Sequence, residues 1–177
     1  LMGKMDPNDL SHGKLISFDP TTKETKTILD SLKRPVFWQQ ADLNKDKLQD
    51  YVVCAFGNYT GQLLAFEATS NSTYKRHVLL NSPGARHIVV QDFDNNGWPD
   101  IMALMTQGDE QITLFSNLGN WVFEATTLLH FPPVYGSGYF EVDDYNGDGN
   151  FDILYTNGDN ADHSAILKPY HGVRLFT

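Results

Sequence analysis

The stretch DYNGDGNFD, residues 144–152, carries an oxygen-bearing side chain at its first, third, fifth and ninth positions. Carboxylates this close repel one another unless a cation or water neutralises them. The stretches DLNKDKLQD (42–50) and DFDNNGWPD (92–100) have oxygen-bearing side chains at the same four positions. The three stretches begin 50 and 52 residues apart, and a fixed period near 50 indicates an internal repeat.

Short apolar runs surround each acidic stretch in a constant order. YVVCAF (51–56), IMALM (101–105) and ILYT (153–156) follow the three stretches directly. They are short, β-prone and bounded by Gly, Asn or Asp, which is typical of buried strands. Three further groups of runs repeat in the same order. The first group is 15–19, 63–67, 112–116 and 173–176, and the second is 25–30, 74–80 and 123–129. The third group leads into the acidic stretches and is 35–43, 86–93 and 138–145. Each unit therefore has about four strands, and no helical pattern stands out.

Four-stranded units repeating at this period predict an all-β fold, a β-propeller segment, rather than a β-sandwich or an open meander. We place the repeat units at about 14–61, 62–110 and 111–172, with a further unit starting at 173–177. The chain 1–177 is then one partial propeller domain of about three four-stranded blades plus the first strand of a fourth. We expect it to be a fragment of a larger propeller, completed by remaining blades or by another chain. A well-folded monomer in gel filtration would count against this expectation.

Composition limits the class of protein and its partners. The chain of 177 residues is 41% hydrophobic and 12% aromatic, which is typical of a globular domain. No apolar run approaches the ~20 residues of a membrane span. The net charge of −9 argues against a nucleic-acid partner. The single cysteine, Cys54, lies in an apolar run, so a buried thiol is expected.

The acidic stretches are candidate metal sites. Oxygen ligands at positions 1, 3, 5 and 9, with a backbone carbonyl at position 7, can surround one Ca²⁺, which takes six to eight oxygen ligands. Mg²⁺ is possible, and the lack of nitrogen and sulfur ligands argues against zinc or copper. The predicted ligands of up to three ions are Asp42, Asn44, Asp46, Leu48 and Asp50; Asp92, Asp94, Asn96, Trp98 and Asp100; and Asp144, Asn146, Asp148, Asn150 and Asp152.

Two other structures can carry acidic stretches of this kind: an EF-hand and a turn without metal. An EF-hand needs Glu at position 12, where this chain has Val53, Ala103 and Tyr155. Asp- and Asn-rich turns without metal remain the alternative. The three loops also differ, because position 6 favours glycine and carries Lys47 in the first loop. A left-handed lysine costs roughly 1–2 kcal/mol and its ammonium repels an ion, so we expect the weakest site at 42–50.

The pattern D-x-[DN]-x-[DN]-x-x-x-D, followed by an apolar strand and repeated about every 50 residues, resembles the FG-GAP/VCBS-type repeat. The resemblance extends from about Lys14 to Thr177. It implies integrin-α-like, calcium-binding blades and an extracytoplasmic location: secreted, periplasmic or cell-surface. It also implies a structural, adhesive or ligand-binding role within a larger protein, with a protein or carbohydrate ligand. In this interpretation the metal stabilises the fold, and Lys47 departs from the family pattern.

One segment breaks the repeat. The apolar runs 15–19, 63–67, 112–116 and 173–176 hold equivalent places in the repeat, and they begin 48, 49 and 61 residues apart. The last interval is longer, so the last unit carries an insertion in 157–172. Such an insertion favours a loop with its own function, although a packed surface loop is the alternative. Together with Tyr135 and Tyr139 it could line a pocket. The candidate ligand-binding residues are Asp159, Asp162, His163, Lys168, Tyr170 and His171.

The competing function is that of a carbohydrate-active enzyme, a lyase or dehydratase, with its site on this insertion. His163 or His171 could then serve as a general base. No nucleophile motif stands out, and the catalytic residues are unknown. We expect His77, His87 and His130 to be structural, and Trp38, Trp98 and Trp121 to pack in the core or against the acidic loops.

Overall fold

The computed structural model describes residues 10–57, 59–70, 72–158 and 169–177, and in this part of the chain it contains thirteen β-strands and no helix. The strands form four antiparallel sheets in which sequence neighbours pair: β1–β2, β3–β6, β7–β10 and β11–β13. Their bounds are β1 Gly13–Phe18, β2 Thr25–Leu32, β3 Pro35–Ala41, β4 Asp50–Ala55, β5 Gln62–Ser70, β6 Thr73–Leu80, β7 Ala85–Gln91, β8 Asp100–Met105, β9 Glu110–Asn117, β10 Phe123–Phe131, β11 Ser137–Asp143, β12 Asp152–Asn157 and β13 Gly172–Phe176.

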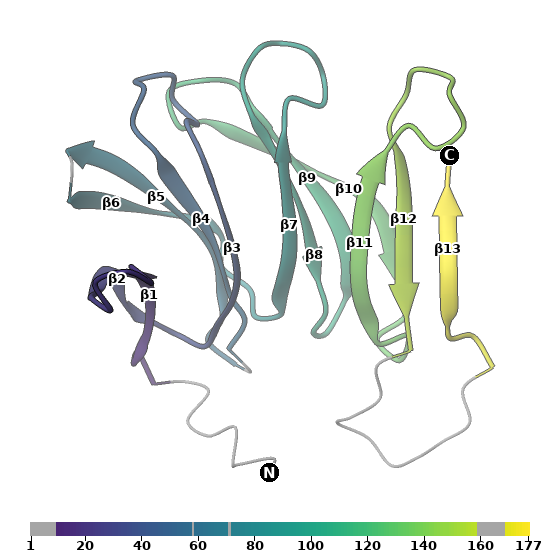
Figure 1. Ribbon diagram of the computed structural model, residues 1–177. Helices are drawn as coiled ribbons and strands as arrows, with labels where there is room; N and C mark the ends of the chain where they lie inside the picture. The colour runs from purple at the N-terminus through teal and green to yellow at the C-terminus, as the bar shows by residue number, and fades with distance from the viewer. Residues whose placement is uncertain (1–9, 58, 71, 159–168) are drawn as a thin grey trace.

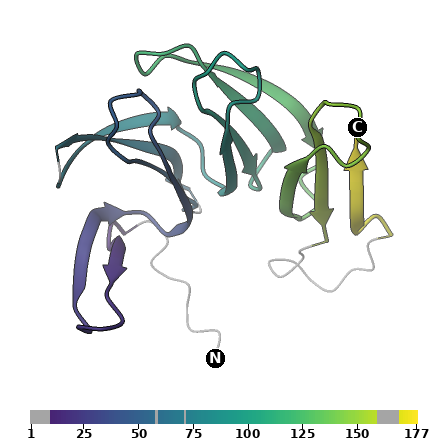
Figure 2. The same ribbon diagram turned by 45° about the horizontal axis from the view of Figure 1, so that its top comes forward.

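The four sheets follow one another along an arc in chain order (Figures 1 and 2). The first strand of each of the last three sheets lies on the inner side, where β3 contacts β7 and β7 contacts β11. The outer strands β6 and β10 lie at the opposite edges of their sheets. This radial arrangement of short meanders confirms the predicted all-β propeller segment. The described part of the chain has no helix long and apolar enough to span a membrane.

The sheets and the predicted repeat units differ in phase. A sheet begins at the strand that leads into an acidic loop, at β3, β7 or β11. The units 14–61, 62–110 and 111–172 begin instead two strands later, so their boundaries fall inside hydrogen-bonded sheets. Counted by sheet, the described part of the chain has two complete four-stranded sheets, one of two strands and one of three.

The strands that follow the acidic loops are buried on both faces, which explains their unbroken apolar sequences. In β4, Val52 and Cys54 face the core shared with β7–β10, whereas Val53 and Ala55 face the core shared with β1–β2. All six residues of β8 are buried in the same way. Because side chains alternate between faces with a period of two, a strand between two sheets needs apolar residues at every position.

Polar contacts join neighbouring sheets where their inner strands meet. The Gln39 side-chain oxygen on β3 accepts a hydrogen bond from the Val90 backbone N–H on β7 at 2.8 Å. Arg86 on β7 donates from Nε to the Gly138 carbonyl on β11 at 2.7 Å. These two bonds connect the inner strands of the last three sheets.

The single cysteine and two of the three tryptophans lie where the sequence predicts. Cys54 is fully buried, and burial raises the pKa of its thiol. Trp121 packs against the core between the second and third sheets, and Trp98 lies in an acidic loop against Gly119. Trp38 differs, because 45% of it is exposed on β3.

Candidate metal centre

The three acidic stretches occupy equivalent positions in the fold. Each joins the first strand of a sheet to the second: β3 to β4, β7 to β8, and β11 to β12. All three loops lie at the same end of the molecule, at the top of Figure 1. The loops that are equivalent in sequence are therefore also equivalent in their position in the fold.

A repeated set of hydrogen bonds shapes each loop, and residues 92–100 illustrate it. Both oxygens of Asp92, at position 1, accept backbone N–H groups, from Asn96 at 3.1 Å and from Gly97 at 2.8 Å. The position-3 side chain, Asp94, accepts the Asn96 N–H at 2.9 Å, and the Asn96 side chain accepts the Trp98 N–H at 2.7 Å. These bonds curl the loop so that successive side-chain oxygens point inward.

The same bonds recur in the other two loops. Asp42 accepts from Asp46 N at 3.0 Å and Lys47 N at 2.8 Å, and Asp144 accepts from Asp148 N at 3.1 Å and Gly149 N at 2.9 Å. Position 5 accepts the position-7 N–H at 2.7 Å in the first loop and 2.8 Å in the third. Each position-7 residue has its N–H bonded back into its own loop.

Two residues of every loop have left-handed backbone conformations. At position 6 these are Lys47 (φ 70°), Gly97 (φ 87°) and Gly149 (φ 89°), which confirms the strained lysine predicted in the first loop. Position 4 is also left-handed, with φ values of 60° at Lys45, 58° at Asn95 and 75° at Gly147. This second position is not evident from the sequence, because only Gly147 in the third loop signals it.

The ninth position of each loop carries a buried aspartate that anchors the loop to the sheet. Asp50 and Asp100 are completely buried, and Asp152 is 1% exposed. Asp100 accepts the Phe93 N–H at 2.9 Å and, with its other oxygen, the Asn117 N–H at the end of β9 at 2.7 Å. Asp50 repeats this arrangement with Leu43 and Ala68. A ninth-position aspartate therefore holds the start of its own loop and, in the first two loops, the end of the third strand.

Burial raises the pKa of both Asp50 and Asp100, and the other aspartates of each loop raise it further. Backbone N–H donors lower the pKa of both groups, but the net shift is upward. A positive charge among these oxygens would favour the ionised form. The electrostatics of the first two loops are therefore favourable for a cation.

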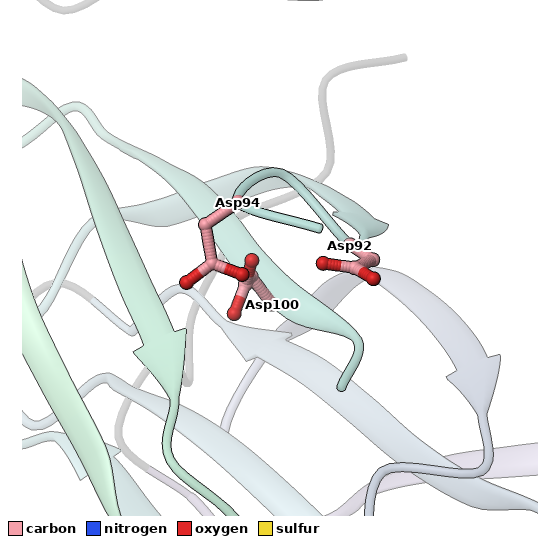
Figure 3. A group of neighbouring side chains, drawn as sticks. All are labelled: Asp92, Asp94 and Asp100. Carbon is pink, nitrogen blue, oxygen red and sulfur yellow. The ribbon is translucent and has the colours of Figure 1, made fainter. Parts of the chain in front are cut away.

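The geometry of the second loop fits a single divalent cation. Asp92, Asp94 and Asp100 each offer an oxygen, and the three oxygens lie within 4.8 Å of one another (Figure 3). Ligands on opposite sides of a Ca²⁺ ion at about 2.4 Å are separated by at most about 4.8 Å, so one ion can contact all three. The donor set is all oxygen, as a hard cation requires.

The first and third loops differ from the second at two ligand positions, where the second loop has Asp94 at position 3 and Asn96 at position 5. Each has asparagine at position 3, Asn44 or Asn146, and aspartate at position 5. Among the residues that the structure describes, three carboxylates meet within the spacing of one ion in the second loop only. An amide oxygen can still serve as a ligand at position 3.

The first two loops are linked to each other through Asn117, a fully buried residue. Its side-chain amide donates to the Leu43 carbonyl of the first loop at 2.9 Å and to the Pro99 carbonyl of the second at 3.0 Å. Its side-chain oxygen accepts the Gly119 N–H at 3.0 Å. Lys45 adds a second link, because its ammonium lies 4.1 Å from the centre of the Trp98 ring.

The candidate ligand-binding residues of the 157–172 insertion are only partly described. Asp159, Asp162, His163 and Lys168 lie outside the described residues. Tyr170 stacks on Tyr135, with ring centroids 4.8 Å apart, and its hydroxyl donates to the Val134 carbonyl at 3.0 Å. His171 is exposed beside Gly158. The two segments that were expected to cooperate thus meet through Tyr135 and Tyr170, and a binding role for them stays a prediction.

Comparison with known proteins agrees with the repeated loops. A search of curated proteins found no match. The model of the FG-GAP-like repeat matches the chain twice, at residues 42–103 and 92–155. Each match begins at the first aspartate of an acidic loop, and together they span more than half of the chain. The chain belongs to the FG-GAP-like repeat family.

Proposed function

We propose that the chain is a calcium-binding β-propeller module in which each acidic loop holds one Ca²⁺. The observation that carries this proposal is the meeting of Asp92, Asp94 and Asp100 within the spacing of one ion, in a loop whose hydrogen bonds recur twice more. In each loop the side chains at positions 1, 3, 5 and 9 and the carbonyl at position 7 supply the ligands. Those carbonyls belong to Leu48, Trp98 and Asn150.

The role of the ions in this proposal is structural. An ion that binds the folded loop better than the unfolded one stabilises the fold by mass action, by about 2.7 kcal/mol per site when its free concentration is 100 times the Kd. Extracellular modules bind calcium at about 0.1–1 mM. The proposal therefore includes an extracytoplasmic setting, as part of a larger protein whose ligand is a protein or a carbohydrate.

The experiment is a calcium titration of chelator-treated protein by calorimetry, with the melting temperature measured in parallel. We expect two or three sites and a rise in melting temperature. Asp94→Asn should weaken the second site, whereas Asp109→Asn, which removes an exposed carboxylate outside the loops, should leave binding unchanged. Mg²⁺ at equal concentration should stabilise less, because it requires a stricter octahedral site.

Absence of binding together with an unchanged melting temperature would overturn the proposal. The loops would then be hydrogen-bonded turns whose charge is solvated. Binding of three ions would bring the formal net charge from −9 to −3, so a change in electrophoretic mobility provides an independent measurement.

A further inference from the structure

Three successive inner strands border a groove where aromatic rings converge. Phe37 of β3 and Tyr139 of β11 flank His87 of β7, with ring centroids 4.2 Å and 4.3 Å from the imidazole. Two adjoining cavities, of about 330 and 320 Å³, share these three residues as lining. Each volume is at the lower end of the range of small-molecule sites.

His87 is a buried polar group without a partner in the described part of the chain. The residue is 6% exposed, and none of the hydrogen bonds or ion pairs of the described residues involves its ring nitrogens. Burial lowers the pKa of His87 to about 4, with Glu141 opposing the shift and Arg86 adding to it, so the ring is neutral at pH 7. A neutral imidazole offers one acceptor nitrogen and one N–H donor. Among the described residues, the fully buried side-chain N and O atoms without a partner are Thr113 Oγ1 and Trp121 Nε1, so the nitrogens of His87 are accessible. They open onto the two cavities that the residue lines, where a ligand can bond to them.

The charges along the groove are separated. Glu141 and Asp143 line the 320 Å³ cavity, whereas Arg34 and Arg86 line the other one. The two Glu141 oxygens accept the hydroxyls of Tyr139 at 3.3 Å and Tyr145 at 3.4 Å. None of the ion pairs of the described residues involves Glu141 or Asp143. This cavity therefore combines aromatic walls with uncompensated negative charge.

We propose that the cavity lined by Phe37, His87, Tyr139 and Glu141 binds a small alkylammonium ligand. The alkyl chain lies against the rings of Phe37 and Tyr139, and the ammonium group donates hydrogen bonds to the Glu141 carboxylate and the acceptor nitrogen of His87. The tyrosine rings add cation–π attraction. Carboxylates repel an anionic ligand, and a neutral apolar ligand would leave His87 without its partner. The cavity borders the third acidic loop through Asp143 and Tyr145, but none of the proposed calcium ligands lines it, and the proposal does not depend on the function proposed for the loops.

The test is a titration of the 177-residue chain at pH 7 in saturating calcium with n-butylammonium chloride, monitored through the NMR signals of the His87 ring. We expect saturable shifts with a Kd of roughly 1 mM, because such a ligand has few atoms. The uncharged analogue 1-butanol should bind at least about tenfold more weakly. The melting temperature of the same samples, with and without calcium, reports the metal sites separately.

Variants identify the groups that recognise the ligand. Glu141→Gln should weaken butylammonium binding about tenfold, since it removes the charge while keeping the shape. Glu124→Gln removes an exposed carboxylate on β10 and should have no effect. His87→Phe keeps an aromatic ring between Phe37 and Tyr139 but removes the acceptor, and should also weaken binding.

Three results would overturn the proposal. One is equal binding of 1-butanol, which would indicate an apolar groove only. Another is unchanged affinity in Glu141→Gln with a normal calcium-dependent melting temperature. The third is binding of the peptide Gly-Lys-Gly at least about tenfold more tightly than butylammonium, which would assign the cavity to a lysine side chain of a protein partner.

Discussion

At the scale of single residues, His87 should make stability depend on pH. Its pKa is about 4 in the folded chain, against an ordinary value of 6.5, because burial disfavours the imidazolium. Between these values the unfolded chain binds more protons than the folded one, so the free energy of unfolding falls as the pH falls. The contribution of His87 is complete above about pH 6.5 and is lost as the pH decreases toward 4. Between pH 7 and pH 5 we expect a loss of about 1–2 kcal/mol.

The measurement is urea unfolding of the wild type and of His87→Phe at several pH values. Only the difference between the two curves reports His87, since the aspartates of the loops also titrate in acid. We expect the free energy of unfolding of the wild type, relative to that of His87→Phe, to fall by the stated amount from pH 7 to pH 5. A difference that does not change with pH would show that the imidazole is protonated equally in both states.

At the scale of the element, the first acidic loop is strained at a position where the other loops have glycine. Lys47 adopts φ 70°, which costs a residue with a side chain roughly 1–2 kcal/mol. Lys47→Gly should raise the free energy of unfolding by about 0.5–1 kcal/mol, because glycine gains freedom in the unfolded chain and so recovers only part of the strain. It should also tighten calcium binding at 42–50 by removing a nearby ammonium.

The matched control is Gly97→Ala, at the equivalent position of the second loop with φ 87°. It should destabilise the protein by about 1–2 kcal/mol. Calorimetric titration of both variants separates the sites. Equal occupancy of all three loops in the wild type at limiting calcium would contradict the prediction that the first loop is the weakest.

The same loops show which elements a sequence can predict. The strands beside them were predictable because β4 and β8 lie between two sheets and carry uninterrupted apolar runs. The left-handed turn at position 4 was obscured, because Lys45 and Asn95 occupy it in two of the three loops. The phase of the sheets was not predictable either, since a periodic sequence has no intrinsic starting point. The hydrogen bond from Asn117 to the Leu43 carbonyl joins residues 74 positions apart, and no local sequence pattern predicts such a contact.

At the scale of the fold, three apolar cores formed by the described residues alternate with the sheets along the arc. The first core joins β1–β2 to β3–β6, the next joins β3–β6 to β7–β10, and the last joins β7–β10 to β11–β13. A second connection runs through polar residues. Glu110 of β9 accepts the backbone N–H groups of Gly136 at 3.0 Å and Ser137 at 2.7 Å, at the start of the next sheet. The last three sheets are thus joined by buried hydrogen bonds as well as by apolar packing.

Asn117 makes the corresponding connection between the first two acidic loops, so it should couple them. Asn117→Ala removes the donor to Leu43 and Pro99 and the acceptor of the Gly119 N–H, all at a buried position. Unsatisfied buried polar groups cost about 1–3 kcal/mol, and we expect a loss of stability of this size. Calcium affinity should fall at both 42–50 and 92–100, because the loops lose their shared support, while 144–152 keeps its own.

The control is Asn81→Ala, which breaks an exposed hydrogen bond with Gln62 and should change stability by less than about 0.5 kcal/mol. Calorimetry of both variants with calcium distinguishes the outcomes. If Asn117→Ala weakened only the second site, Asn117 would support its own loop without coupling the two. If it weakened both by the same factor, the two loops would act as one unit, and the repeat would bind its ions in pairs of neighbouring blades rather than one blade at a time.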